Sequence, residues 1–190
     1  MIRPRIIPIL LLKDSGLVKT LQFKNPKYIG DPINAIRIFN DKEVDELVLL
    51  DIDASKSNEM PDLNVLKNIT SECFMPLSFG GGIHSIEMIR EILKIGVEKV
   101  ILNSAVVKNP NLISEASRNF GKSTIVVSID YKKNFLHNNV YINGGNTKTK
   151  LKPIEWAIEC ERLGAGEIII NSIKKDGTMS GYDFDLLKSI

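Results

Sequence analysis

Short apolar runs alternate with amphipathic segments along the whole chain. The runs are apolar almost throughout, and continuous apolarity is typical of parallel strands whose two faces are both covered. We therefore predict six strands, over Arg5–Leu12, Glu46–Ile52, Met75–Phe79, Lys99–Asn103, Thr124–Asp130 and Glu167–Asn171.

Helix signals fill the intervals between these runs. An Asp or Ser N-cap, or a proline in the first turn, marks the beginning of a helix, and a glycine marks its end. The predicted helix starts are Asp31-Pro32, Ser85, Asn109-Pro110, Lys152-Pro153 and Tyr182, and the predicted ends include Gly96 and Gly164.

Two polar stretches, Lys13–Phe23 and Tyr131–Lys150, follow a strand where a helix is due. Each contains turn residues and short alternating segments, which predicts a β-hairpin within a long loop. No stretch rich in Pro, Gly or Ser divides the chain, so residues 1–190 are expected to form a single domain.

Six consecutive strand–helix units are compatible with a doubly wound open sheet or with a (β/α)₈ TIM barrel. Neither GxGxxG nor GxxxxGK[ST] follows the first strand, which disfavours the open sheet of nucleotide-binding proteins. Val44–Asp51 resembles Ala165–Ser172, as in a barrel of two four-unit halves. Since such a barrel has eight units in about 250 residues, this barrel is expected to be C-terminally incomplete, with six units present.

Composition narrows the class of protein. The formal charge of +2, with no basic run, argues against a nucleic-acid partner. The longest apolar run, Ile6–Leu12, is too short to cross a membrane. Cys73 and Cys160 are far apart and outside any metal-binding motif, so neither metal nor cofactor is expected, and a cytoplasmic location is the simplest.

Chemistry in a barrel lies at the C-terminal ends of the strands. Gly80-Gly81-Gly82 follows the third strand there, and its backbone N–H groups could hold a phosphate next to a helix N-terminus. A tight turn that requires positive φ is the alternative. Asn103 and Ser104 end the fourth strand and could form a second wall of the same phosphate site.

Carboxylates end other strands. Asp130 could act as a general acid or base, or could instead cap a loop or pair with a neighbouring lysine. Of Asp51 and Asp53, one could bind a hydroxyl-rich ligand and the other could cap the loop, and Asp176-Gly177 could be a turn only. Lys19 lies in the loop after the first strand and is a candidate for phosphate or substrate binding.

Charged residues precede four of the apolar strands, at the opposite ends. They are Arg5, Glu46, Lys99 and Glu167. Each by itself could simply solvate the floor of the barrel. Two basic and two acidic side chains on a closed ring could instead form a salt-bridged gate.

These residues resemble the cyclase subunit of imidazole glycerol phosphate synthase, a (β/α)₈ barrel of histidine biosynthesis. The likeness extends from Arg5 to Ile190. Its specific pieces are Gly30-Asp31-Pro32, Asp45–Ile52, Gly80–Ile83, Glu98–Val100, Asn103–Ala105, Val126–Asp130, Leu163–Ile168 and Asp176–Asp183.

The resemblance implies a partner and a reaction. In that family a glutaminase docks at the barrel floor, and its ammonia passes a gate that matches Arg5, Glu46, Lys99 and Glu167. Two aspartates then act as acid and base on a bis-phosphorylated nucleotide, and Asp130 matches the second. The family pattern Cys-Leu-Asp-Val-Lys-Asp-Gly reads Ile-Leu-Leu-Leu-Lys-Asp-Ser here, so that Leu11 stands where the first aspartate belongs.

Loss of one of two cooperating carboxylates largely disables their reaction. The sequence is similar to a diverged branch of the family that is thought to supply ammonia for amidation of a surface-polysaccharide sugar, with a glutaminase and an ATP-dependent amidotransferase. We favour this role. The alternatives are an active cyclase that makes imidazole glycerol phosphate, and a silent scaffold that only activates the glutaminase.

Overall fold

The computed structural model describes residues 4–54, 60–133 and 138–189. The chain falls into two compact units. Unit 1 comprises Met1–Val18 and Tyr28–Ile101, and unit 2 comprises Lys19–Lys27 and Leu102–Ile190. The expectation of a single domain therefore stays a prediction.

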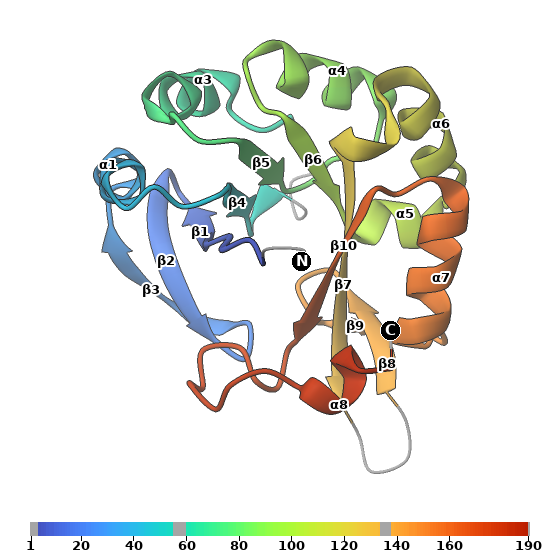
Figure 1. Ribbon diagram of the computed structural model, residues 1–190. Coiled ribbons are helices and arrows are strands. Elements are labelled where there is room, and N and C mark those ends of the chain that lie inside the picture. Colours follow the sequence, from blue (N-terminus) through green and yellow to red (C-terminus); the bar gives the residue numbers. More distant parts are fainter. Residues whose placement is uncertain (1–3, 55–59, 134–137, 190) are drawn as a thin grey trace. The chain divides into compact units, whose positions relative to one another are not determined.

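Parallel strands form the sheet of unit 1 (Figure 1). Its parallel neighbours, in order, are β1 (Ile9–Lys13), β4 (Leu47–Asp51), β5 (Leu77–Gly80) and β6 (Lys99–Leu102). On the other side β1 pairs antiparallel with β2 (Gly16–Leu21), which lies next to β3 (Lys24–Gly30). The hairpin predicted after the first strand is confirmed.

Helices α1 (Pro32–Asp41), α3 (Leu63–Glu72) and α4 (Ile86–Lys94) follow these strands. The two predicted N-caps are confirmed, because Asp31 accepts from the Asn34 N–H and Ser85 from the Met88 N–H. The sequence analysis missed α3, which has its own Asp62 cap. The inner faces of these helices carry buried apolar side chains, which include Ile36, Leu66, Ile69, Ile89 and Ile92.

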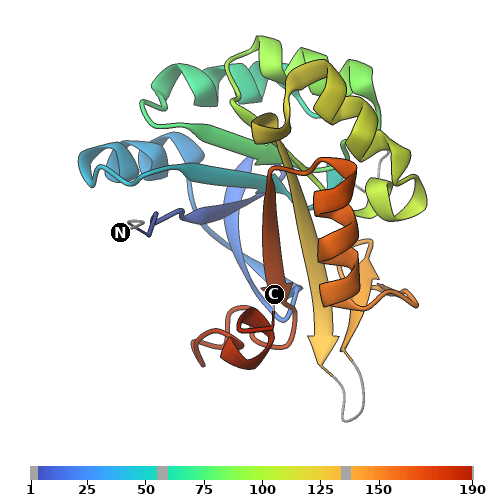
Figure 2. The ribbon, with the colours of Figure 1, turned by 45° about the vertical axis from the view of Figure 1, so that its right-hand side comes forward.

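Unit 2 has β7 (Ile125–Lys133) at its centre. It pairs in parallel with β10 (Glu167–Ser172) and antiparallel with β8 (Asn138–Ile142), which pairs with β9 (Thr147–Lys148). The second predicted hairpin is thereby confirmed, although residues 134–137 lie outside the described chain. Figure 2 shows α7 (Pro153–Leu163) running alongside β7.

The remaining helices of unit 2 are α5 (Ser104–Lys108), α6 (Asn111–Phe120) and α8 (Phe184–Leu187). Gly164 ends α7 in the left-handed conformation, as predicted. Together the units contain six βα pairs, which begin with β1, β4, β5, β6, β7 and β10. The chain therefore has the α/β architecture of the predicted barrel class.

Several predicted boundaries were wrong by one to four residues. β1 begins at Ile9 rather than Arg5, because Pro4 and Pro8 lack the N–H that a ladder requires. β6 ends at Leu102, since Asn103 leaves the strand conformation to begin α5, a helix that the sequence analysis missed. The helix predicted over Tyr182–Ile190 begins at Phe184 and is short, and Ile190 is outside the described residues.

Candidate functional site

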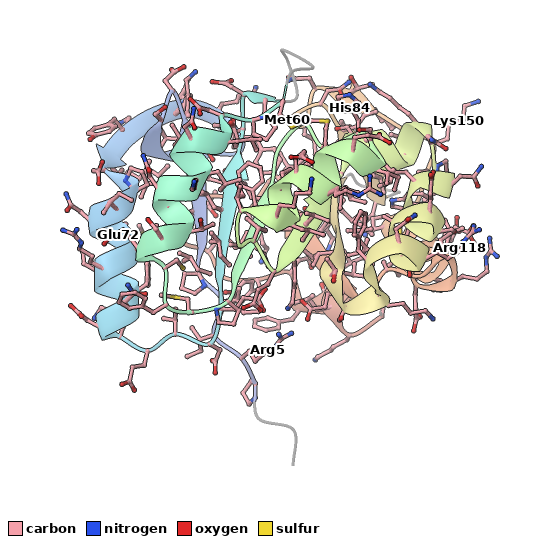
Figure 3. The ribbon with its side chains drawn as sticks, turned by 90° about the horizontal axis from the view of Figure 1, so that it is seen from above. Arg5, Met60, Glu72, His84, Arg118 and Lys150 are labelled. Atoms are coloured by element: carbon pink, nitrogen blue, oxygen red, sulfur yellow. The ribbon has the colours of Figure 1, made fainter. Side chains whose placement is uncertain are left out.

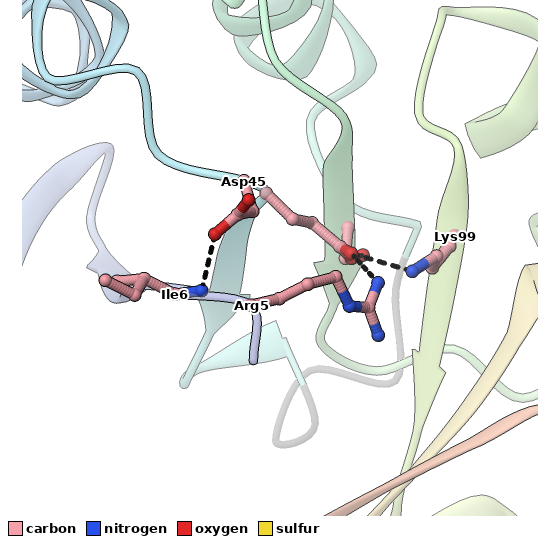
Figure 4. Close-up of polar contacts among 6 residues, drawn as sticks. Arg5, Ile6, Asp45 and Lys99 are labelled. Carbon is pink, nitrogen blue, oxygen red and sulfur yellow. Dashed lines mark hydrogen bonds and ion pairs between the residues drawn. The ribbon is translucent and has the colours of Figure 1, made fainter. Parts of the chain in front are cut away.

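A buried carboxylate organises the edge of unit 1 where its parallel strands begin (Figure 4). Glu46 precedes β4, and only 3% of the residue is exposed. Its Oε2 accepts from Arg5 Nη1 at 3.1 Å and from Lys99 Nζ at 2.7 Å. Its Oε1 accepts from Ser78 Oγ at 2.5 Å. Charge and hydrogen bonds together stabilise a carboxylate that burial would otherwise disfavour.

Three of the four predicted gate residues thus meet within unit 1. Arg5 remains half-exposed, whereas only 13% of the Lys99 side chain is exposed. The segment that carries Arg5 is also fixed by a 2.7 Å hydrogen bond from the Ile6 N–H to Asp45 Oδ2 (Figure 4). The fourth predicted residue, Glu167, begins β10 in unit 2.

The opposite edge of unit 1 carries the glycine-rich turn. Figure 3 shows Arg5 at one end of this unit and His84, directly after the turn, at the other. Gly81 and Gly82 have φ angles of 138° and 65°. A Cβ on Gly81 would lie 2.6 Å from the Asp51 carbonyl oxygen, so the backbones approach too closely for any side chain. Both expectations for this turn, an anion cradle and a tight positive-φ turn, are compatible with this backbone.

Asp51 ends β4 beside this turn. Its Oδ1 accepts from the N–H groups of Asp53 and Ala54, each at 3.0 Å. Lys13, at the end of β1, forms an ion pair with Asp53. Asp51 therefore fixes the loop that passes beneath Gly81 and Gly82. Through this loop, Asp51 could influence a ligand bound at the glycine-rich turn.

Leu11 lies in an apolar row on the sheet of unit 1. Its register neighbour on β4 is Leu50, which is level with Gly80 on β5. Leu12 faces the other side, where it lines a small cavity together with Leu66 of α3 and Phe79. Because side chains alternate along a strand, Leu11 points away from the helices, to the face that encloses the interior in barrels of this class.

Asp130 is the buried carboxylate of unit 2. It lies on β7 in register with Asn171 of β10, and 8% of the residue is exposed. Asn103 Nδ2 donates to Asp130 Oδ2 at 2.8 Å and to the Ser128 carbonyl oxygen at 3.0 Å. Burial raises the pKa of Asp130 to about 6, against hydrogen bonds from Asn103 and Asn171 that lower it, while the nearby charge of Asp176 raises it. A carboxyl with such a pKa can exchange protons near neutral pH.

Ser104 follows Asn103 at the start of α5. Its hydroxyl donates to Asn103 Oδ1 at 3.1 Å and accepts from the N–H of Asn143 at 2.9 Å. Ser104 is thus engaged by the β8–β9 hairpin, so a phosphate would have to share or displace that contact.

Asp176 and Gly177 hold the tip of the β2–β3 hairpin in unit 2. Asp176 Oδ2 accepts from Thr20 Oγ1 at 2.8 Å and from the Phe23 N–H at 3.0 Å. A Cβ on Gly177 would lie 2.1 Å from the Thr20 carbonyl oxygen. Lys19 is exposed on β2, next to Thr20.

Two polar partners, Ser78 and Asn143, were not predicted from the sequence, whereas Asn171 was expected only as a polar residue at the end of the sixth strand. Ser78 is a buried polar residue in an otherwise apolar strand, and Asn171 is level with Asp130, so their positions carried a usable signal. Asn143 acts through its backbone N–H, which side-chain chemistry does not reveal.

Within the described ranges no group of three or more His, Cys, Asp or Glu side chains could hold a metal ion. Cys73 and Cys160 are both free. In the same part of the chain, no helix is long and apolar enough to cross a membrane.

The family model described as histidine biosynthesis protein matches residues 5–190. A Pseudomonas aeruginosa protein, provisionally named imidazole glycerol phosphate synthase subunit hisF2, is 50% identical over 100% of this chain and 76% of its own length. A Leptospira interrogans relative, provisionally named subunit HisF, is 48% identical over 99% of this chain and 75% of its own. The Petrotoga mobilis imidazole glycerol phosphate synthase subunit HisF is 43% identical over 100% of this chain and 76% of its own length. The chain therefore belongs to the cyclase-subunit family of imidazole glycerol phosphate synthase, within the histidine biosynthesis proteins.

Proposed function

We propose that this chain is a diverged cyclase-like barrel that receives ammonia from a glutaminase and delivers it for amidation of a surface-polysaccharide sugar. The observation that carries the proposal is Leu11. It occupies the position of the first catalytic aspartate in the family pattern, and its register neighbour is Leu50. An aliphatic side chain cannot transfer a proton, so the two-carboxylate reaction lacks one of its members.

The charged cluster at the other edge supports the ammonia part of the proposal. Arg5 and Lys99 both donate to Glu46, while Leu11 stands where the family pattern has an acid. A route for ammonia would be retained only if ammonia were still used. In this proposal Glu167, which begins β10 in unit 2, is a further charged residue of the ammonia route, and the glutaminase docks where the strands begin.

The ligand is proposed to be a phosphorylated sugar or nucleotide. Gly81 and Gly82 would offer backbone N–H groups to one phosphate, and Asp51 fixes the adjacent loop against which these glycines pack. In unit 2, Asn103 and Ser104 would offer an amide and a hydroxyl to a phosphate. A further contact is assigned to Lys19, which extends from the hairpin that Asp176 and Gly177 hold in place.

Asp130 would serve as the acid–base group. Its pKa of about 6 leaves the carboxylate mostly ionised at pH 7 but able to accept a proton. In an amidation reaction it would take up the proton that attacking ammonia releases.

The main alternative is an active cyclase that makes imidazole glycerol phosphate and the aminoimidazole carboxamide nucleotide. The names of the relatives favour it, since the Petrotoga mobilis protein is named as a synthase subunit. A silent scaffold that only activates the glutaminase is the other alternative, and the same gate cluster would suit it.

One assay separates the active cyclase from the other two functions. Ammonium salt is supplied directly, so that no glutaminase is needed, and loss of the formimino nucleotide is followed. We expect turnover at least about 10²-fold below that of a family member with aspartate at this position, because positioned proton transfer contributes about 10²–10⁴-fold. Turnover equal to that of the aspartate-containing enzyme would return the chain to histidine biosynthesis.

A second assay distinguishes amidation from the silent scaffold. The glutaminase and the amidotransferase are added with ¹⁵N-amide glutamine and a phosphorylated or nucleotide-linked sugar. Appearance of ¹⁵N in the sugar product supports amidation. Glutamine hydrolysis that is stimulated without label in any sugar supports the scaffold.

A further inference from the structure

The acid–base candidate Asp130 is connected to a loop of unit 2 through an unbroken series of hydrogen bonds. The Asn143 N–H donates to Ser104 Oγ at 2.9 Å, and Ser104 Oγ donates to Asn103 Oδ1 at 3.1 Å. Asn103 Nδ2 then donates to Asp130 Oδ2 at 2.8 Å. Three bonds therefore join the tip of the β8–β9 hairpin to the carboxylate.

The direction of each bond is fixed by its partners. A backbone N–H can only donate, so the Ser104 oxygen must accept from Asn143, and its single proton is left for the Asn103 carbonyl oxygen. The two amide protons of Asn103 then face the Ser128 carbonyl and the Asp130 carboxylate, which are both acceptors. Only one orientation of the Asn103 amide satisfies every group.

The hairpin end of this series is itself held in place. Lys132 Nζ donates to the Gly145 carbonyl oxygen at 2.7 Å and lies 4.3 Å from the centre of the Tyr141 ring. Asn143 has a φ of 55° and donates its side-chain amide to Thr147 Oγ1 at 3.1 Å. The turn is therefore well ordered by its own contacts, and a movement of the turn would displace the Asn143 N–H group by a corresponding amount.

We propose that Ser104 is a positioning residue whose hydroxyl couples the β8–β9 hairpin to the orientation of Asn103 and thereby to the Asp130 carboxylate. This inference deepens the proposed function, since it rests on Asp130 acting at the reacting centre. A ligand that contacts the hairpin would then alter the acid–base group without touching it.

The test measures the coupling directly, without turnover. The protein is labelled with ¹³C and ¹⁵N, and the Asp130 carboxyl carbon and the backbone amides are followed by NMR between pH 5 and 8. In the wild type the Asn143 amide resonance is expected to shift with the Asp130 midpoint. The Tyr141 amide is the internal control, because Tyr141 is paired with Asp130 in the β7–β8 ladder and does not depend on Ser104.

Ser104→Ala removes the hydroxyl, and Ser104→Thr keeps it. In Ser104→Ala we expect the Asn143 response to disappear while that of Tyr141 remains. The Asp130 midpoint should rise by about half a unit to one unit, because a loosened Asn103 amide stabilises the carboxylate less. Asp176 and Asn171, the other groups that influence Asp130, are unchanged in both variants. Ser104→Thr should behave as the wild type.

Two results would overturn the inference. One is a wild-type Asn143 amide that does not follow the Asp130 titration, which needs no variant and so remains decisive if Ser104→Ala fails to fold. The other is a Ser104→Ala protein with an unchanged Asp130 midpoint. Neither bears on the amidation or cyclase assays, so failure of the coupling and failure of the proposed function are distinguishable.

Discussion

The Lys99 ammonium lies 2.7 Å from Glu46 Oε2, and both side chains are largely buried where β6 and β4 begin. The carboxylate also accepts from Arg5 and Ser78, so that each of its oxygens has a donor. A buried ion pair contributes little net stability compared with apolar packing, but breaking it leaves an uncompensated charge. The pair therefore fixes the positions of the two charged side chains, while its net contribution to stability is expected to be small.

Removing Glu46 is expected to destabilise the protein strongly. Glu46→Ala leaves Lys99 buried without this carboxylate, and loss of one partner of a buried pair costs about 3–5 kcal/mol. Urea unfolding followed by circular dichroism measures the change. Glu98→Gln is the matched control, because Glu98 is an exposed neighbour of Lys99, and its effect should stay within about 0.5 kcal/mol. Equal effects of the two variants would contradict the buried-pair description.

Asp130 makes stability depend on pH in a defined direction. Its pKa is raised from 3.8 to about 6 in the folded protein, so folding favours the protonated form. Stability from this group is present below pH 4 and is lost as the pH rises through 6. Asp130→Asn removes this dependence, so the unfolding free energy of the variant relative to wild type should increase by about 2.4 kcal/mol between pH 4 and pH 8. Denaturant titrations of both proteins at each pH cancel the contributions of other groups, and a difference that does not change with pH would refute the assignment.

The glycine-rich turn should not tolerate a side chain at Gly81. Its φ of 138° is strained for other residues, and an added Cβ would lie 2.6 Å from backbone at Asp51. We expect Gly81→Ala to destabilise the protein by about 2 kcal/mol or more. Gly16→Ala is the control, since the Cβ there would meet only the exposed Tyr28 ring, which can move, and should cost well under 1 kcal/mol. Similar midpoints in thermal unfolding of the two variants would argue against the turn geometry.

Asp176 should protect the tip of the β2–β3 hairpin from hydrogen exchange. Its carboxylate accepts the Phe23 N–H and the Thr20 hydroxyl. In Asp176→Ala the Phe23 amide is expected to exchange about tenfold faster, as loss of a hydrogen bond to a charged group allows. Asp185→Ala, which removes an exposed carboxylate in α8, should leave that rate unchanged. Unaltered exchange at Phe23 in Asp176→Ala would show that other contacts hold the hairpin.

The strand–helix alternation was predictable from the sequence because it depends on local pattern. Continuous apolar runs marked all six parallel strands, and the Asp31 and Ser85 caps marked two helix starts. The helix α3 was not predicted, although the sequence carries an Asp cap at Asp62 directly before it, of the same kind as Asp31 before α1. The start of β1 was predicted wrongly because it depends on where the ladder with β4 begins. The end of β6 was predicted wrongly because it depends on the turn into α5.

The sequence by itself determined the α/β class and the family, since each of these is a property of residue type and spacing. Only the tertiary structure decided which polar groups meet. Ser78 is 32 positions from Glu46, and Asn143 is 39 positions from Ser104, yet each pair is in hydrogen-bond contact. Such contacts arise because neighbouring parallel strands in unit 1, and a returning hairpin in unit 2, bring distant segments of the chain together. In unit 2, burial raises the pKa of Asp130, a quantity that depends on the surrounding atoms and not on the order of residues in the chain.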